Sequence, residues 1–218
     1  MAGSATSASK ASATKRVRKA ATTATATPAL AEPPTSELAC FSDGGGQFPN
    51  FRYFRYWWRG EGQRPSIVPL IDKKLRPGDD PRFGIAAKID LLLPDDAPGD
   101  YLDLAHLLER YGARHQPWQQ SALVQLNFYL EDGQSAFALF ERVRSFCRVQ
   151  FVSAGCPVIL TLHVPGYAGH ENPAHCHAQI LPRTLGPMGF GSWHHDLACD
   201  TGNRSIYAAW QGSLALQP

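Results

Sequence analysis

Apolar residues recur with two different periods along the second half of the chain, and the two periods predict a series of strands and helices. Runs rich in β-branched and apolar residues predict strands at 83–93, 122–132, 156–164 and 176–181. Apolar residues at helical spacing, closed by a glycine, predict helices at 99–112 and 133–155. In 122–132, Leu, Val and Phe alternate with Gln, Asn and Tyr, which is typical of a half-buried strand.

The connection between the last two predicted strands determines the fold class. It consists of about ten residues rich in Gly and Pro, too few for a crossover helix, so the two strands should pair antiparallel. The sequence therefore predicts a single α+β domain over residues 39–218, with an antiparallel β-sheet and helices packed on it.

Residues 1–38 differ from the rest of the chain in composition. Ala, Ser and Thr dominate them, five Lys and Arg cluster between positions 10 and 19, and large apolar side chains are almost missing. Such a segment cannot offset its ordering entropy, so we predict a disordered basic tail. A solvated linker is the favoured interpretation, and a phosphate-holding tail and an organelle transit peptide are the alternatives.

Composition bounds the possible functions. The chain has 218 residues, 44% of them hydrophobic, and a net charge of +2, so any binding of nucleic acid must come from local patches. Its five cysteines form no CxxC pair, which favours reduced thiols over a disulfide framework. No apolar run approaches the roughly 18 to 20 residues of a membrane span, and no secretory signal follows the basic residues. We expect a soluble, cytoplasmic protein without a membrane partner.

The segment "FRYFRYWWR", residues 51–59, interleaves aromatic and basic side chains. Trp57 and its neighbouring rings could stack bases while Arg52, Arg55 and Arg59 hold phosphates. An equally weighted alternative is a short edge strand whose rings dock on the core and whose arginines point outward.

Histidines near residue 170 predict a metal site. Residues i and i+2 of a strand share a face, so His175 and His177 lie side by side, and antiparallel pairing brings His163 toward them. Three neutral imidazoles with an open position are typical of a divalent transition metal site. The alternative is chance, since surface strands carry such pairs and His170, His194 and His195 make the whole region rich in histidine.

A series of motifs in this region occurs in a specific order. They are "ALVQLNFYLEDGQSAFALFERVRSFC", "PVILTLHVP", "NPAHCH", Arg183, "LGPMGFG" and "RSIYAAWQGSLAL". With these motifs, residues 83–216 resemble the MobA/MobL family of plasmid mobilisation relaxases, which belong to the HUH endonucleases. Asn-x-x-His-x-His followed by Arg183 and Gly-Pro-x-Gly-Phe-Gly is far more specific than the histidine pair alone.

The resemblance implies a palm-like antiparallel sheet on which His163, His175 and His177 hold a divalent metal ion such as Mn, Mg or Zn. It implies nicking and rejoining of single-stranded DNA at a transfer origin, through a tyrosine linked to the 5′-phosphate. Single-stranded DNA and other mobilisation proteins would be the partners, Arg183 a DNA-binding residue, and the bacterial cytoplasm the compartment.

One feature of the family has no counterpart in this chain. Members usually carry the nucleophile in an N-terminal Ala-Ala-Tyr-Arg-type segment after a first strand. Tyr53 and Tyr56, each beside arginines, are the nearest candidates by position. Two other hypotheses therefore stay open: a non-catalytic relative that binds nucleic acid or metal, and a three-histidine metallohydrolase that acts on another substrate.

Overall fold

The computed structural model describes residues 38–43, 48–59, 64–78, 86–113, 115, 118–199 and 201–215. All of them belong to one unit, residues 32–218. The predicted tail lies outside the described residues, apart from Leu38, which begins the first strand.

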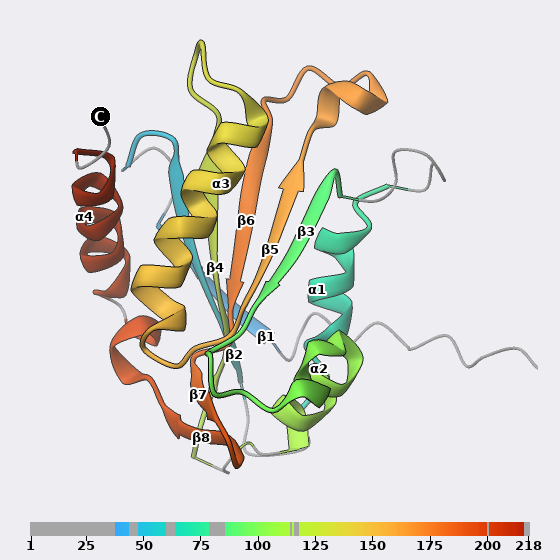
Figure 1. The fold of residues 1–218 in the computed structure, drawn as a ribbon, viewed down its shortest axis with the longest axis vertical. Coiled ribbons are helices and arrows are strands. Elements are labelled where there is room, and N and C mark those ends of the chain that lie inside the picture. The colour runs from blue at the N-terminus through green and yellow to red at the C-terminus, as the bar shows by residue number, and fades with distance from the viewer. Residues whose placement is uncertain are drawn as a thin grey trace, which may run out of the picture. The chain divides into compact units, whose positions relative to one another are not determined.

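A six-stranded antiparallel sheet forms the centre of the fold (Figure 1). Its spatial order is β1 (Leu38–Ser42), β2 (Phe51–Trp58), β4 (Ser121–Tyr129), β6 (His175–Ile180), β5 (Val158–His163) and β3 (Lys88–Leu92). A separate hairpin contains β7 (Arg183–Gly186) and β8 (Gly189–Trp193). The predicted antiparallel pairing of the last two long strands is confirmed, as is the α+β class.

Helices cover both faces of the sheet (Figure 1). They are α1 (Val68–Leu75), α2 (Leu104–Ala113), α3 (Ala136–Cys147) and α4 (Gly202–Ala215). Short helical segments are η1 (Gly99–Leu102), η2 (Arg148–Val152, a π-helix), η3 (Pro165–Ala168) and η4 (His195–Ala198). Within the described ranges, none of the helices combines the length and apolar character that crossing a lipid bilayer requires.

The sheet separates two hydrophobic cores. On one face, α3 and α4 bury residues such as Phe140 and Trp210 against Phe128 of β4. On the other, α1 and α2 bury residues such as Ile71 and Tyr111. Burial on both faces makes the prediction of a half-buried strand for 122–132 wrong: Ala122 to Phe128 are all buried. The polar side chains of Gln125 and Asn127 are therefore buried and do not face water.

The regular helix in the region predicted as 133–155 is shorter than expected and is followed by a π-helix. Ser135 caps α3 by accepting a hydrogen bond from the Ala138 N–H at 3.0 Å, so the regular helix begins at Ala136. The π-helix η2 continues it, and the chain leaves at Gly155, whose φ of +86° favours glycine.

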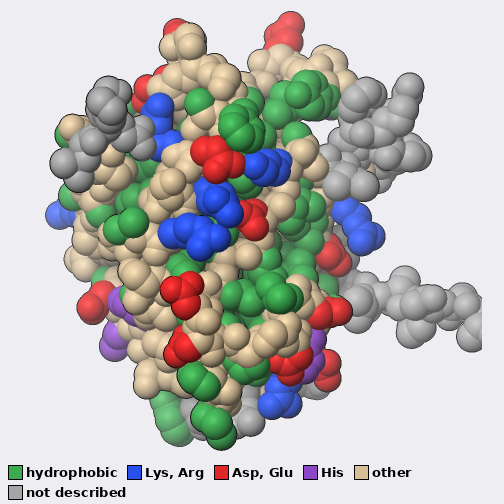
Figure 2. Space-filling view, in the orientation of Figure 1, with side chains coloured by type: hydrophobic (Ala, Val, Ile, Leu, Met, Phe, Trp, Pro, Cys, Tyr) green, Lys and Arg blue, Asp and Glu red, His purple; other side chains and the backbone are tan. Residues whose placement is uncertain are grey.

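Charged side chains over α3 and β3 lie in pairs of opposite sign (Figure 2). Lys88 Nζ lies 2.8 Å from Glu141 Oε1, and Arg144 Nε lies 2.5 Å from Asp90 Oδ2. These two ion pairs offset the positive charges of Lys88 and Arg144.

Candidate metal centre

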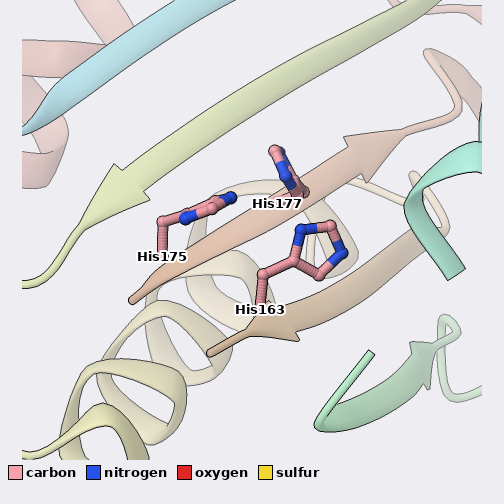
Figure 3. A group of neighbouring side chains, drawn as sticks. All are labelled: His163, His175 and His177. Carbon is pink, nitrogen blue, oxygen red and sulfur yellow. The ribbon is translucent and has the colours of Figure 1, made fainter. Parts of the chain in front are cut away.

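Three histidines gather on the face of the sheet that α1 and α2 cover (Figure 3). His175 and His177 project from the same face of β6, and His163, the last residue of β5, is the register partner of His175. One ligand nitrogen from each ring lies within 4.8 Å of the others. The two strands thus bring together the three residues that the sequence pattern predicts.

Each ring has one nitrogen next to an oxygen that can only accept a hydrogen bond. These contacts are His163 Nε2 to Lys74 O at 2.6 Å, His175 Nδ1 to Pro173 O at 2.9 Å, and His177 Nδ1 to Asn127 Oδ1 at 2.6 Å. We assign the proton of each ring to that nitrogen, because an oxygen that only accepts needs a donor opposite it. The Asn127 oxygen also accepts from Gln125, which agrees with its role as an acceptor for His177. The lone pairs are then on His163 Nδ1, His175 Nε2 and His177 Nε2.

Burial keeps this group neutral. His163 and His177 are 8% and 4% exposed. Desolvation lowers the pKa of all three rings and lowers that of His177 to about 2, with nearby positive charge as a further cause. Three neutral imidazoles with free lone pairs could hold a metal ion without first releasing a proton.

An amide chain supports His177 from the neighbouring strand. Asn127, opposite His177 in the register, accepts from His177 and also from Gln125 Nε2 at 3.0 Å. Asn127 and Gln125 are 6% and 2% exposed. The sequence contains the signal, since Gln and Asn occur at i and i+2 of a strand, but their alternation with apolar residues predicts a half-buried strand and not a buried amide pair.

Lys74 is the second contributor that the sequence did not reveal. It lies in the last turn of α1, where backbone carbonyls have no partner within the helix, and its carbonyl accepts from His163. Its ammonium group lowers the pKa of each of the three histidines. An anion bound beside the group would therefore be stabilised by Lys74.

A cleft of about 510 Å³ opens onto this group. His163 and His175 line it, together with Tyr167, His170 and Asn172 from the loop between β5 and β6. Two of the three rings thus contact a space large enough for part of a substrate.

The two tyrosines predicted as nucleophiles lie elsewhere. Tyr53 has no exposed surface and packs in the α3/α4 core on the opposite face, where its hydroxyl donates to Leu197 O at 2.9 Å. Tyr56 shares the face of the histidines but pairs with Leu123, roughly 13 Å along the strand from Asn127. Burial, with the Cys40 thiol nearby, raises the pKa of Tyr56.

Two other tyrosines lie beside the histidines. Tyr129, the last residue of β4, is the register partner of His175, and their ring centroids are 5.5 Å apart. Tyr167 is 64% exposed and lines the cleft. Neither tyrosine directly follows an arginine in the sequence, whereas Tyr53 and Tyr56 both do.

The residues predicted to bind DNA are dispersed. The Arg52 guanidinium lies 5.9 Å from the Tyr129 ring centroid, near the histidines, while Arg55 packs on Trp57 and donates to Ala198 O. Arg59 is exposed just after β2. Arg183 is 5% exposed, and its guanidinium donates to Gly191 O at 2.7 Å in the β7–β8 hairpin.

Comparisons with known proteins leave the family open. No known protein family matches the sequence, and no curated protein matches it. A solved structure described as "Molecular Basis of Vancomycin Resistance Transfer in Staphylococcus aureus" has 17% sequence identity and a TM-score of 0.48, covering 59% of this chain and 67% of that chain. A likeness at this level carries no argument about this protein.

Proposed function

We propose that this protein is a relaxase-like enzyme that nicks and rejoins single-stranded DNA with a divalent metal ion held by His163, His175 and His177. The observation that carries the proposal is the cluster of three imidazole rings, whose ligand nitrogens lie within 4.8 Å of one another and each of which is held by a hydrogen bond to an oxygen. The motif order that resembles MobA/MobL relaxases supports the choice of reaction.

Charge supports a phosphate as the group that enters the cleft. The Lys74 ammonium is close enough to lower the pKa of all three histidines, and a phosphodiester bound at the metal ion would be attracted to both positive charges. Arg52, near Tyr129, adds a further cation on the same side. A bound divalent ion would supply Lewis-acid polarisation of a phosphoryl oxygen.

A tyrosine near the three histidines would supply the nucleophile. In the proposed step, the phenolic oxygen of Tyr129 or Tyr167 forms a bond to phosphorus, the bond from phosphorus to the 3′-oxygen breaks, and the phenolic proton ends on the 3′-hydroxyl. The reverse step rejoins the strand. We favour these two tyrosines because they lie beside His175 and in the cleft.

The donor set favours a transition metal ion over magnesium. Imidazole nitrogens suit ions such as Zn²⁺, whereas Mg²⁺ prefers oxygen ligands. The group of three contains no carboxylate.

Metal binding can be tested separately from catalysis. The double variant His175→Ala, His177→Ala should lose binding of Zn²⁺ and Mn²⁺ in a chelator competition, because two of the three ligand nitrogens are gone. His194→Ala, His195→Ala is the matched control, since it removes two histidines outside the group, and it should bind like the parent. A double variant that binds as tightly as the parent would refute the metal site.

Strand transfer can be tested with a pool of single-stranded oligonucleotides that share a random central region. The label belongs at the 3′ end, because a 5′-phosphotyrosine link retains the 3′ fragment. With Mn²⁺, the parent should give an adduct that survives denaturation, and it should be lost in His175→Ala, His177→Ala.

Single Tyr→Phe variants at positions 53, 56, 129 and 167 then identify the nucleophile. Loss of the adduct in the position 129 or 167 variant supports a nucleophile near the three histidines, and loss only at position 53 or 56 refutes it. Binding without any adduct would favour the non-catalytic relative, and cleavage without an adduct would favour the metallohydrolase.

A further inference from the structure

A second cavity lies at the end of the sheet away from the histidines, where Figure 1 labels β7 and β8. Its volume is about 550 Å³. Ser121, which begins β4, lines this cavity, whereas Tyr129, which ends β4, lies beside His175. The two sites are therefore separated by roughly 26 Å along the strand. We call this cavity the Trp118 pocket, after the residue that forms its most exposed wall.

Trp118 is 79% exposed although tryptophan is highly buried on average. A second indole, Trp193 at the end of β8, lines the same cavity. A large flat ring left open to solvent at the mouth of a cavity is suited to stacking on a planar heterocycle.

Gln119 provides an independent sign of a ligand. This side chain is only 7% exposed and lines the pocket, yet its Nε2 has no hydrogen-bond partner among the described residues. A buried donor without an acceptor destabilises the fold, and a ligand or an ordered water that accepts from it would offset that cost. An N–H beside an aromatic wall matches the ring nitrogens and carbonyl oxygens of a nucleobase edge.

The charge of the pocket favours a nucleotide over a peptide carrying a positive charge. Arg183 lines it, held in place by Gly191 O and Phe190 O, and the exposed His195 lies at its rim. The described lining residues include neither Asp nor Glu. The same cavity therefore offers a stacking surface, a hydrogen-bond donor and a positive charge for a phosphate.

We propose that the Trp118 pocket binds an unpaired nucleobase, stacked on Trp118 and contacted by the Gln119 amide, with its phosphate on the side of Arg183. The inference rests on the proposed function only for the ligand class, single-stranded nucleic acid. It requires neither a metal ion nor a nucleophile, because the pocket is remote from the histidines.

The experiment measures binding of a fluorescein-labelled oligothymidylate to the full chain in the presence of EDTA. Trp118→Ala should weaken the affinity about 5- to 150-fold, the range expected from the loss of one stacked base. Phe137→Ala is the matched control: Phe137 is 62% exposed, lies on α3 outside the pocket, and should leave the affinity unchanged. Circular dichroism spectra of both variants verify the fold.

An abasic strand of equal length and charge separates stacking from phosphate attraction. The parent should bind it more weakly than oligothymidylate, and Trp118→Ala should not weaken that binding further. Equal affinity of the parent for both strands, no effect of Trp118→Ala, or no binding of any strand would overturn the proposal. A Trp118-dependent complex that never forms an adduct with Mn²⁺ would support the pocket and count against the proposed nicking reaction, so the two ideas fail separately.

Discussion

Lowering the pH from 7 to 5 should destabilise the metal-free protein because of His177. This ring is 4% exposed, and its pKa is lowered from 6.5 to about 2, chiefly by burial and further by the positive charge of Lys74. In the folded chain it is therefore neutral at both pH values. In the unfolded chain it takes up a proton as the pH falls below 6.5.

The direction and the size of the stability change follow from this difference in protonation between the folded and the unfolded chain. A histidine whose pKa is lowered on folding stabilises the fold fully above its unfolded pKa, and that stability is lost as the pH falls toward the folded pKa. Over the roughly 1.5 units between 6.5 and 5, at about 1.36 kcal/mol per unit, His177 accounts for about 2 kcal/mol. His163 and His175, whose pKa values are also lowered, add in the same direction.

Urea unfolding at pH 7 and pH 5, with a chelator present, gives the change in free energy of unfolding for the parent and for His177→Gln. Glutamine removes the titrating group, so the variant should lose about 2 kcal/mol less than the parent over this interval. His170→Gln, at an exposed position in the neighbouring loop, is the control and should follow the parent. An equal pH-dependent loss in the parent and in His177→Gln would refute the reasoning.

Three further variants test separate parts of the structure. Asn127→Leu should weaken metal binding about 10- to 100-fold in a chelator competition, because His177 loses its hydrogen-bond acceptor, and Asn127→Asp should retain it. Tyr53→Phe should cost about 1 kcal/mol in urea unfolding, through loss of the bond to Leu197 O, with unchanged metal affinity since Tyr53 faces the other core. Gly155→Ala should lower the free energy of unfolding by at least about 1 to 2 kcal/mol, because φ is +86° and the new Cβ would lie 3.2 Å from Thr184; no loss would show that the chain relaxes there.

The period of two residues was sufficient to predict the histidine group. It placed His175 and His177 on one face, and the short loop before them required an antiparallel neighbour that ends at His163. Both inferences are local, which is why a single sequence contains them.

The supporting contacts could not be predicted in the same way. Lys74 reaches His163 only because α1 packs over the sheet, and the sequence pattern predicts no helix at 68–75. The burial of Asn127 depends on the same helix layer. Alternation shows which side chains share a face, but not whether a helix will cover that face.

The contact between Lys74 and His163 joins residues that are 89 positions apart in the chain. The three histidines come together only when β5 has paired with β6, and His163 gains its Lys74 contact only when α1 has docked. An unfolded chain cannot reproduce this arrangement. An ion that binds there selects the folded chain and would raise its stability by about 2.7 kcal/mol at a free concentration one hundred times its dissociation constant. The availability of metal would then set how much of this protein survives proteolysis, independently of any reaction that it catalyses.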